Sequence, residues 1–194
     1  RCKLLKQLAI PFDVVVPNVD ESRQTNELVE AMVKRLALAK TKRIALGFDR
    51  AGLIVIGCDQ MVAVDNTVMG KPYRHKVALK QLRLCSGKVL DSYTALCVYD
   101  SVADRYHEHL AHCRVYFKSL TEEMMEHYLI RDKPYHCAGS IRAEGLGVAL
   151  FDRIEADDVT ALTGLPLIKL VDILSSIGFD VLDPHYGTTL AESC

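Results

Sequence analysis

Two long runs of β-forming residues near the middle of the chain constrain the fold more than any other feature. The runs are KVLDSYTALCVYD, residues 88–100, and YHEHLAHCRVYFKSL, residues 106–120, and they are joined near residues 101–104. Two such runs with so short a connection predict an antiparallel hairpin. Strands and helices alternate elsewhere, so we expect an α/β fold in which helices surround a mixed β-sheet that contains the hairpin.

Periodicity assigns the other segments to helices and shorter strands. The 194 residues are about the size of one large domain, and no internal repeat or low-complexity linker divides them, so residues 1–194 are predicted to form a single domain. The longest helix is expected to be capped near Thr25 and Asn26, and Thr121 is expected to cap another. Helices are predicted at residues 1–10, 20–46, 74–87, 121–132 and 164–179, and strands at 11–19, 53–59 and 61–65.

Composition excludes several classes of function. The net charge of −1 provides no basic field for a nucleic-acid polymer, and no apolar segment is long enough to cross a membrane. The seven cysteines are odd in number and form no CxxC pair, which indicates reduced, mostly buried thiols and argues against a zinc site. We therefore expect a cytoplasmic protein that binds neither nucleic-acid polymers nor membranes.

The segment IGCDQMVAVDNTVMGKP, residues 56–72, contains the first candidate site. The apolar run LIVIG precedes Asp59 and Gln60, and Lys71 follows on a Gly-Pro turn. Ligands in α/β folds bind at the carboxyl ends of strands, which is where Asp59 is expected. An isolated aspartate more often caps a turn, so Asp59 alone does not establish a site.

Further charged residues are predicted to gather at the same place. Asp20 and Glu21 follow another predicted strand, and acidic residues on adjacent strands could hold a hard divalent cation such as Mg²⁺. Lys40, Lys71 and Arg1 could neutralise the phosphate oxygens of a triphosphate, while a carboxylate orients or deprotonates the attacking water. Each lysine taken singly is more often a solvated surface residue.

A glycine-punctuated segment, HCAGSIRAEGLG at residues 136–147, is the second candidate site. Its glycines permit close approach of the backbone to a ligand, and Glu144 is a charge among small residues. A glycine-rich segment by itself is weak support, because it could simply connect two elements. The sequence lacks a P-loop pattern, a nucleophile elbow and a His-paired cysteine suited to nucleophilic catalysis.

An ordered series of short motifs runs from Arg1 to about Ile177: RCKLLKQL, VDE, LALAK, GCDQ, GKP, LCSG, YTALCV, HCAGSIRAEGLG and TGLPL. The series resembles the Maf family of nucleotide pyrophosphatases. The resemblance implies an elongated mixed sheet with two lobes around a cleft, similar to inosine-triphosphate pyrophosphatase. It also implies cleavage of nucleoside triphosphates between the α and β phosphates, giving a monophosphate and pyrophosphate, with Mg²⁺, Mn²⁺ or Co²⁺ as the divalent metal.

The same resemblance assigns roles to the candidate residues. It implies that Asp59 is the general base and also a metal ligand together with Glu21, and that Asp20 belongs to the same metal and water shell. Lys40 and Lys71 match the family's phosphate-site lysines.

The resemblance also concerns the N-terminal residue and the identity of the base. Arg1 matches the first arginine of a phosphate-cradling S-x-S-P-x-R-R loop, and the second is Cys2 here. Gln60 and Glu144 resemble the branch that acts on 7-methyl-GTP rather than the branch for dTTP and UTP. Guanine offers two adjacent N–H donors that one carboxylate can accept, and the positive charge of 7-methylguanine attracts a carboxylate further. We therefore hypothesise that Glu144 reads the base.

Other readings stay open. The chain could be a dTTP and UTP pyrophosphatase, or a non-catalytic nucleotide-binding regulator of cell division, since family members have been associated with septum formation. It could also be a structural α/β domain whose strand-end acids are caps. The enzyme reading implies a house-cleaning hydrolase of nucleotide metabolism, and the resemblance allows for a homodimer.

Overall fold

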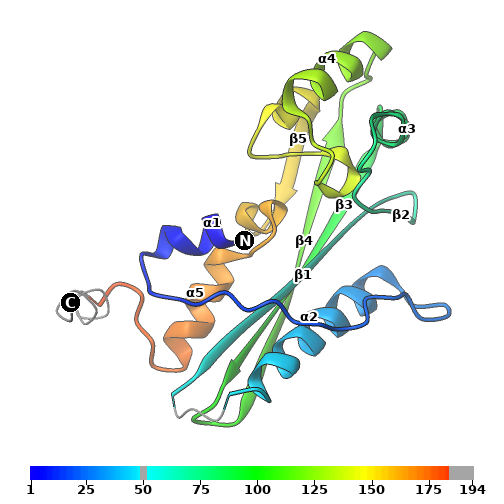
Figure 1. Cartoon of the computed structure of the whole chain (residues 1–194). Helices are drawn as coiled ribbons and strands as arrows, with labels where there is room; N and C mark the ends of the chain where they lie inside the picture. The colour runs from blue at the N-terminus through cyan, green and yellow to red at the C-terminus, as the bar shows by residue number, and fades with distance from the viewer. Residues whose placement is uncertain (49–51, 184–194) are drawn as a thin grey trace.

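The computed structural model of the chain describes residues 1–48 and 52–183. At its centre is a five-stranded sheet in the order β2-β1-β3-β4-β5, in which β3 and β4 form one long hairpin (Figure 1). The strands are β1 (Ile54–Val64), β2 (Thr67–Met69), β3 (Val89–Asp100), β4 (Arg105–Phe117) and β5 (Phe151–Ala156). The α-helices are α1 (Cys2–Leu5), α2 (Val29–Ala45), α3 (His75–Cys85), α4 (Glu122–Asp132) and α5 (Leu167–Ser176). The 3-10 helices are η1 (Lys6–Leu8), η2 (Ala138–Ser140), η3 (Leu146–Leu150) and η4 (Val159–Thr163).

The α/β class and the elongated sheet with flanking helices are confirmed, but the sheet is not mixed. Every neighbouring pair of strands is antiparallel. The strand predicted at residues 11–19 is extended coil, and no backbone hydrogen bond joins it to another described segment. Its β-forming composition is not sufficient, because Pro11 and Pro17 lack N–H donors and a strand needs a paired edge. The two-lobe arrangement and the single-domain extent stay predictions.

The two short strands predicted at residues 53–59 and 61–65 are one continuous strand, β1. Asp59 therefore lies in the middle of a strand and not at its carboxyl end, which corrects the sequence prediction. Because successive residues of a strand point to opposite faces, Asp59 and Gln60 face different sides of the sheet. Asp59 contacts Lys40 of α2, whereas Gln60 contacts η4 through the carbonyl oxygens of Ala161 and Leu162.

The ends of two helices test the capping predictions. The longest predicted helix begins at Val29, later than expected, because Asn26 adopts a left-handed backbone conformation with φ of 58° that interrupts a right-handed helix. Its N-cap is Leu28 rather than a residue near Thr25. The prediction for α4 is confirmed, since the Thr121 side chain accepts a hydrogen bond from the backbone N–H of Met124.

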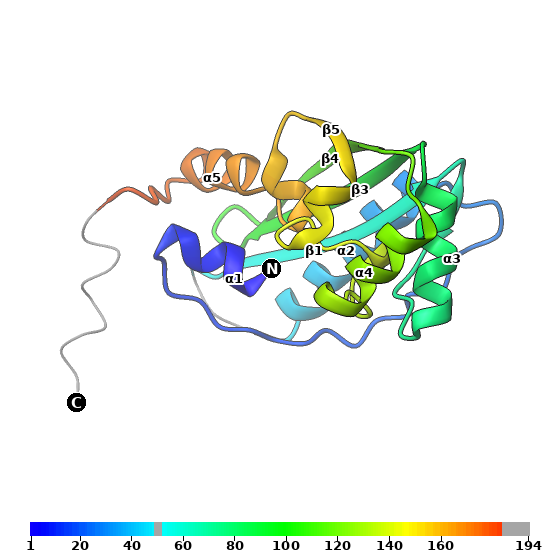
Figure 2. The same cartoon turned by 90° about the horizontal axis from the view of Figure 1, so that it is seen from above.

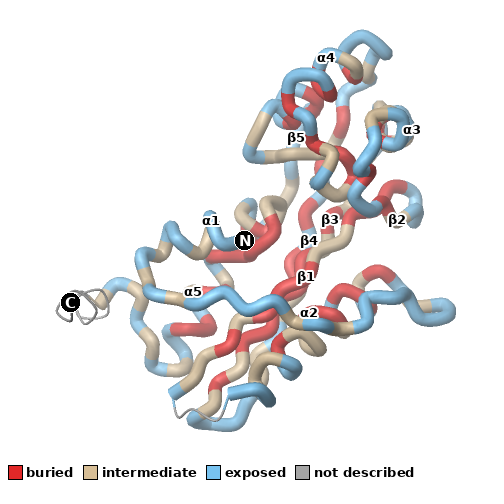
Figure 3. Tube along the Cα trace, viewed as in Figure 1, coloured by how far each residue is buried: buried red, intermediate tan, exposed pale blue. Residues whose placement is uncertain are grey.

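Apolar side chains pack on both faces of the sheet, and many of the buried residues lie along its strands (Figure 3). On β3, Ala95 and Cys97 pack with α2, while the alternate residues Leu96 and Val98 pack with α5 on the opposite face. Helices α3 and α4 lie side by side over one end of the sheet (Figure 2). On the face that carries α5, the central part of β3 has two buried polar residues, Ser92 and Thr94. Ser92 lies within hydrogen-bond distance of Gln60.

Two predictions from composition can be compared with the structure. The six cysteines within residues 1–48 and 52–183 are free thiols, and four of them are buried, as expected; Cys194 lies outside the described residues. None of the helices in that part of the chain combines the length and apolar character that a bilayer crossing requires.

Candidate active site

Three charged side chains from α2, β1 and the extended segment before α2 meet at one point. Lys40 Nζ lies 2.7 Å from Asp59 Oδ1 and 2.6 Å from Glu21 Oε1, so one ammonium group donates to both carboxylates. The side chains of Asp59 and Lys40 are only 10% and 12% exposed, whereas that of Glu21 is 61% exposed. The cation therefore lies between one buried carboxylate and one that faces solvent.

Close packing of α2 on β1 fixes this geometry. A Cβ atom at Gly57 would lie 2.0 Å from Thr41 Oγ1 and 2.8 Å from the carbonyl oxygen of Ala37, so only glycine lets the helix approach this closely. Lys40 precedes Thr41 on the helix. Asp59 is two residues beyond Gly57 and therefore lies on the same face of β1. The crossing of two backbones thus brings the ammonium and the carboxylate together.

Burial and charge act differently on the ionisable groups of this site. Burial by itself lowers the pKa of Lys40, but hydrogen bonds to Asp59 and Glu21 outweigh it, and the net pKa is raised. Lys40 therefore stays an ammonium ion at neutral pH. Burial raises the pKa of the Cys58 thiol to about 11, although the charge of Arg1 opposes the shift, so this thiol stays protonated and a poor nucleophile.

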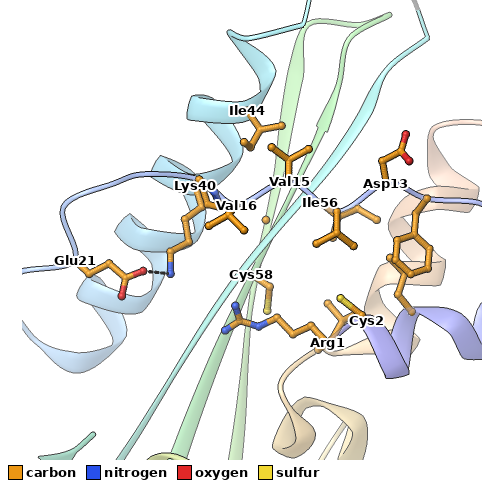
Figure 4. A pocket seen from close by; sticks show the side chains of 16 residues that line it. Arg1, Cys2, Asp13, Val15, Val16, Glu21, Lys40, Ile44, Ile56 and Cys58 are labelled. Atoms are coloured by element: carbon orange, nitrogen blue, oxygen red, sulfur yellow. Dashed lines mark ion pairs between the residues drawn. The ribbon is translucent and has the colours of Figure 1, made fainter. Parts of the chain in front are cut away.

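Arg1 approaches the same carboxylate from the other side. Its Nε donates to the carbonyl oxygen of Gly164 at 3.2 Å, and its guanidinium lies 4.0 Å from Asp59 Oδ1. Arg1 and Lys40 enter one pocket from different elements (Figure 4). The pocket has a volume of about 340 Å³, and its apolar walls include Val15, Val16, Ile44 and Ile56.

A second pocket, with a volume of about 240 Å³, collects most of the other predicted residues. Gln60, Lys71 and Glu144 line it together with His136, and Arg1 borders this pocket as well as the first. Val62, Leu90 and Ile141 add apolar surface beside these polar groups, a combination that is typical of small-molecule sites. The pair of pockets therefore suits a ligand with a ring at one end and negative charge at the other.

Contacts to the protein restrict what Gln60 can offer to a ligand. Its Nε2 lies 3.0 Å from the carbonyl oxygens of Ala161 and Leu162 and 3.2 Å from Ser92 Oγ. A primary amide has two N–H donors and one carbonyl acceptor. The protein takes up the donors, and the carbonyl oxygen is the part that remains for a ligand.

The acidic residues can be tested as ligands of a divalent cation. In residues 1–48 and 52–183, no three His, Cys, Asp or Glu side chains gather as a ready-made metal site. Asp59 and Glu21 nevertheless share one cation, the ammonium of Lys40. Mg²⁺ is commonly held by one or two carboxylates and completed by substrate phosphates and water. The donor set therefore fits a cation that is bound together with a phosphate-bearing ligand.

The structure does not bring Asp20 to this site. Its Oδ1 accepts a hydrogen bond of 2.9 Å from the backbone N–H of Ser22, which lowers the pKa of its carboxyl group, and it lines neither pocket. Glu21 reaches Lys40 from extended coil and not from the end of a strand, so the proposed pair of adjacent strand ends is wrong.

Sequence reasoning missed two residues that shape the site. Gly57 permits the helix-strand contact, and its signal was a glycine inside an otherwise apolar strand. His136 lines the second pocket and meets Tyr73 edge-on, with ring centroids 5.8 Å apart. Its signal was its position at the start of the glycine-punctuated segment.

Comparison with known proteins shows which family the sequence belongs to. The chain is 42% identical over 182 residues to a protein of Methylobacillus flagellatus named 7-methyl-GTP pyrophosphatase, which covers 94% of each chain. A protein of the same name from Colwellia psychrerythraea is 42% identical over 94% of this chain and 90% of its own length. Another, from Pseudoalteromonas translucida, is 40% identical over 98% of this chain and 94% of its own length.

The family comparison covers both pockets. Residues 1–177 match the family described as Maf-like protein, a range that includes Arg1, Asp59 and Glu144. The match and the similarity to the relatives extend over nearly the whole chain, as the ordered motifs predicted. This chain belongs to the Maf family.

Proposed function

We propose that this protein is a nucleotide pyrophosphatase that hydrolyses nucleoside triphosphates between the α and β phosphates, with 7-methyl-GTP or a related modified nucleotide as its substrate. The observation that carries the proposal is the ammonium of Lys40 held between Asp59 and Glu21, with Arg1 beside them. The name that the relatives share supports the same reaction and the same nucleotide.

Three cationic side chains would bind the triphosphate. Lys40 and Lys71 belong to different pockets, and Arg1 borders both. A chain of phosphates that runs from one pocket to the other would therefore pass Arg1 and meet a lysine at each end. Cations in a partly buried site stabilise the charge on phosphate oxygens, and they do so most strongly where negative charge develops on the leaving group.

Asp59 is the residue best placed to activate water. Its carboxylate is buried and held by Lys40. In the proposed reaction the water oxygen bonds to one of the two phosphorus atoms that flank the bridging oxygen, and its proton passes to Asp59. The bond from that phosphorus to the bridging oxygen breaks, so that a nucleoside monophosphate and pyrophosphate result.

Glu21 and Asp59 would hold the divalent cation, whether Mg²⁺, Mn²⁺ or Co²⁺. When bound, such a cation neutralises phosphate oxygens and polarises the phosphorus. In this structure the ammonium of Lys40 contacts both carboxylates. If it turned to a phosphate of the substrate instead, both carboxylates would be free to bind the divalent cation.

Glu144 would read the base in the second pocket. One carboxylate can accept the two adjacent N–H groups of guanine, and the positive ring of 7-methylguanine adds an attraction that uracil lacks. Gln60 would present its carbonyl oxygen to the same ring, since its amide nitrogen is committed to Ala161 and Leu162.

The test is pyrophosphate release from 7-methyl-GTP, GTP, UTP, dTTP and CTP, each with Mg²⁺, Mn²⁺ or Co²⁺. Asp59→Asn removes the base, and Asp91→Asn is the matched control, because Asp91 is a strand carboxylate that pairs with the imidazole of His112 and lines neither pocket. We expect preferential release from 7-methyl-GTP, a loss of about 100-fold or more in Asp59→Asn, and no loss in the control.

The other outcomes separate the alternatives. Turnover mainly of UTP and dTTP would keep the reaction and overturn the assignment of Gln60 and Glu144. Binding of nucleotides without any pyrophosphate release would favour a non-catalytic regulator of cell division. Equal activity of Asp59→Asn and the unchanged protein would remove Asp59 from the mechanism.

Family membership also suggests the cellular setting. We propose a cytoplasmic house-cleaning role in nucleotide metabolism, with septum formation as the process on which a regulatory role would act. A homodimer is proposed on the same basis. Fractionation of cells and measurement of the molar mass in solution would test these two points.

A further inference from the structure

The segment that contains Glu144 is attached to α4 by two side chains one helical turn apart, Tyr128 and Asp132. The hydroxyl of Tyr128 donates to the carbonyl oxygen of Ser140 at 3.2 Å and accepts from the backbone N–H of Arg142 at 3.0 Å. Because residues four apart lie on one face of a helix, a single face of α4 supports this segment. Tyr128 thus fixes the main chain just before Glu144.

Asp132 fixes the same segment on both sides of Glu144. Its side chain is only 1% exposed; Oδ1 forms an ion pair with the guanidinium of Arg142 and accepts from the backbone N–H of Leu146 at 3.3 Å. In the described part of the chain, the other oxygen, Oδ2, is buried and has no hydrogen-bond partner. A buried oxygen without a partner costs stability, so stability alone does not account for a carboxylate here.

The turn between these two attachments is tightly closed. The backbone N–H groups of Gly145 and Gly147 both donate to the carbonyl oxygen of Arg142, at 3.1 and 3.2 Å. A Cβ atom at Gly145 would lie 2.4 Å from Arg142 Nε and 2.9 Å from Asp132 Oδ1, and one at Gly147 would lie 2.5 Å from the Arg142 carbonyl oxygen. The turn therefore has little freedom while Asp132 and Arg142 stay in place.

The residues of this turn also form one wall of the second pocket. Ile141, Ala143 and Glu144 line the pocket, whereas Tyr128 and Asp132 do not. A displacement of the turn would move the carboxylate of Glu144 relative to Gln60 and Lys71 on the other walls. Hydrogen bonds between a carboxylate and a base edge depend on both distance and angle, so a small displacement weakens them.

We propose that Asp132 and Tyr128 are positioning residues for base recognition, which act through the turn around Arg142 to hold Glu144 against the edge of the base. This inference rests on the proposed function, in which Glu144 reads a guanine-type base. The two residues touch neither the base nor the phosphates. Their effect is on the ratio of kcat/KM for 7-methyl-GTP to kcat/KM for UTP, here called the discrimination ratio.

The test compares Asp132→Asn, Tyr128→Phe, Glu144→Gln and the double variant Asp132→Asn with Glu144→Gln. The control is Glu122→Gln, which removes an exposed ion pair with Arg83 from the same helix, far along it from the turn. We expect the discrimination ratio to fall about 10-fold in Asp132→Asn and less in Tyr128→Phe, with kcat for UTP unchanged and the control unaffected. The double variant should lose no more discrimination than Glu144→Gln alone, because Asp132 acts through Glu144.

The outcomes separate this inference from the proposed function. An unchanged ratio in Glu144→Gln would overturn base reading by Glu144 itself. A reduced ratio in Glu144→Gln but not in Asp132→Asn or Tyr128→Phe would overturn only the positioning role. If the thermal melting curve shows that Asp132→Asn does not fold, the positioning role is tested with Tyr128→Phe alone. Its equilibrium binding of 7-methyl-GMP relative to UMP should fall, and an unchanged binding ratio would overturn the positioning role. Additive losses in the double variant would also contradict the proposal.

Discussion

The charged cluster of Asp59 and Lys40 beside the first pocket and the turn that carries Glu144 into the second pocket are held in place by different kinds of structure. Asp59 and Lys40 belong to a strand and a helix whose backbones touch at Gly57, so their geometry is set by the packing of regular elements. Glu144 lies on a turn whose position depends on a few side-chain hydrogen bonds to α4. Reaction chemistry would thus be tied to the core, and base preference to a part that can change without disturbing it.

The comparison predicts that changes in the first pocket reduce activity on every nucleotide. The largest effect is expected for Lys40→Gln, which leaves two carboxylates without their shared cation and removes the proposed phosphate contact. Pyrophosphate release should fall about 100-fold or more for all substrates, with the discrimination ratio unchanged. Lys34→Gln, an exposed position on the same helix, is the control. A loss confined to one nucleotide would break the comparison.

The next largest effect concerns the contact between the two backbones. In Gly57→Ala the new methyl group would meet the carbonyl oxygen of Ala37, which cannot rotate away, so the helix must shift. We expect a loss of about 1–3 kcal/mol in the free energy of unfolding, measured in urea, together with lower activity. Gly70→Ala should be neutral in stability, because a Cβ atom there has nothing within 4 Å. Equal stability of the two variants would show that α2 tolerates a wider spacing.

A matched substitution in the turn that carries Glu144, at Gly145, should behave differently. In Gly145→Ala the methyl group would meet the guanidinium of Arg142 and Oδ1 of Asp132, which are side-chain atoms and not backbone, so the ion pair that holds the turn would shift rather than the helix. We expect a loss of about 1 kcal/mol or less in the free energy of unfolding but a discrimination ratio that falls several-fold. Thermal melting and kinetics with 7-methyl-GTP and UTP check both parts. A large loss of stability with an unchanged ratio would place the turn in the core instead.

The smallest effect is expected for alkylation of Cys58, the residue beside Asp59. Its folded pKa of about 11 lies above the ordinary value of 9.0, so the thiol stays neutral at pH 7.5 and alkylation by iodoacetamide should be much slower than at exposed Cys2. The stabilisation from a neutral buried thiol is complete below pH 9 and is lost as the pH rises towards 11. Peptide mass spectrometry after treatment at pH 7.5 and at pH 10 measures the extent of alkylation of Cys58 and of Cys2. Equal labelling at pH 7.5 would mean that the first pocket opens readily.

Much of the fold could be predicted from the sequence, because the long β-forming runs and the amphipathic helices are local signals. The hairpin and the cap at Thr121 are examples. The segment 11–19 shows the limit, since β propensity does not say whether an edge is available for pairing. Asp59 shows the same limit in a strand, because alternation could not tell a strand end from a strand centre.

The candidate site was predicted in part. Lys40, Asp59 and Glu21 were expected at one site and do meet there, but the direct contacts of Lys40 with both carboxylates were not predicted, and the expectation for Asp20 was not met. The roles of these residues in binding and catalysis stay predictions. The attachment of the Glu144 turn to α4 could not be foreseen, because it depends on two side chains whose partners are 10 to 14 residues away along the chain.

The fixed orientation of the Gln60 amide has a consequence for the design of inhibitors. A side-chain amide that could rotate by 180° would pair with either a donor or an acceptor on a ligand. The Gln60 amide cannot do so, because its nitrogen Nε2 lies beside three protein oxygens. A ring that places a lone pair opposite Gln60 would face repulsion between two oxygens, whereas one that places an N–H there would gain a hydrogen bond. Base analogues that differ only in the tautomer they prefer should therefore be separable by this one side chain.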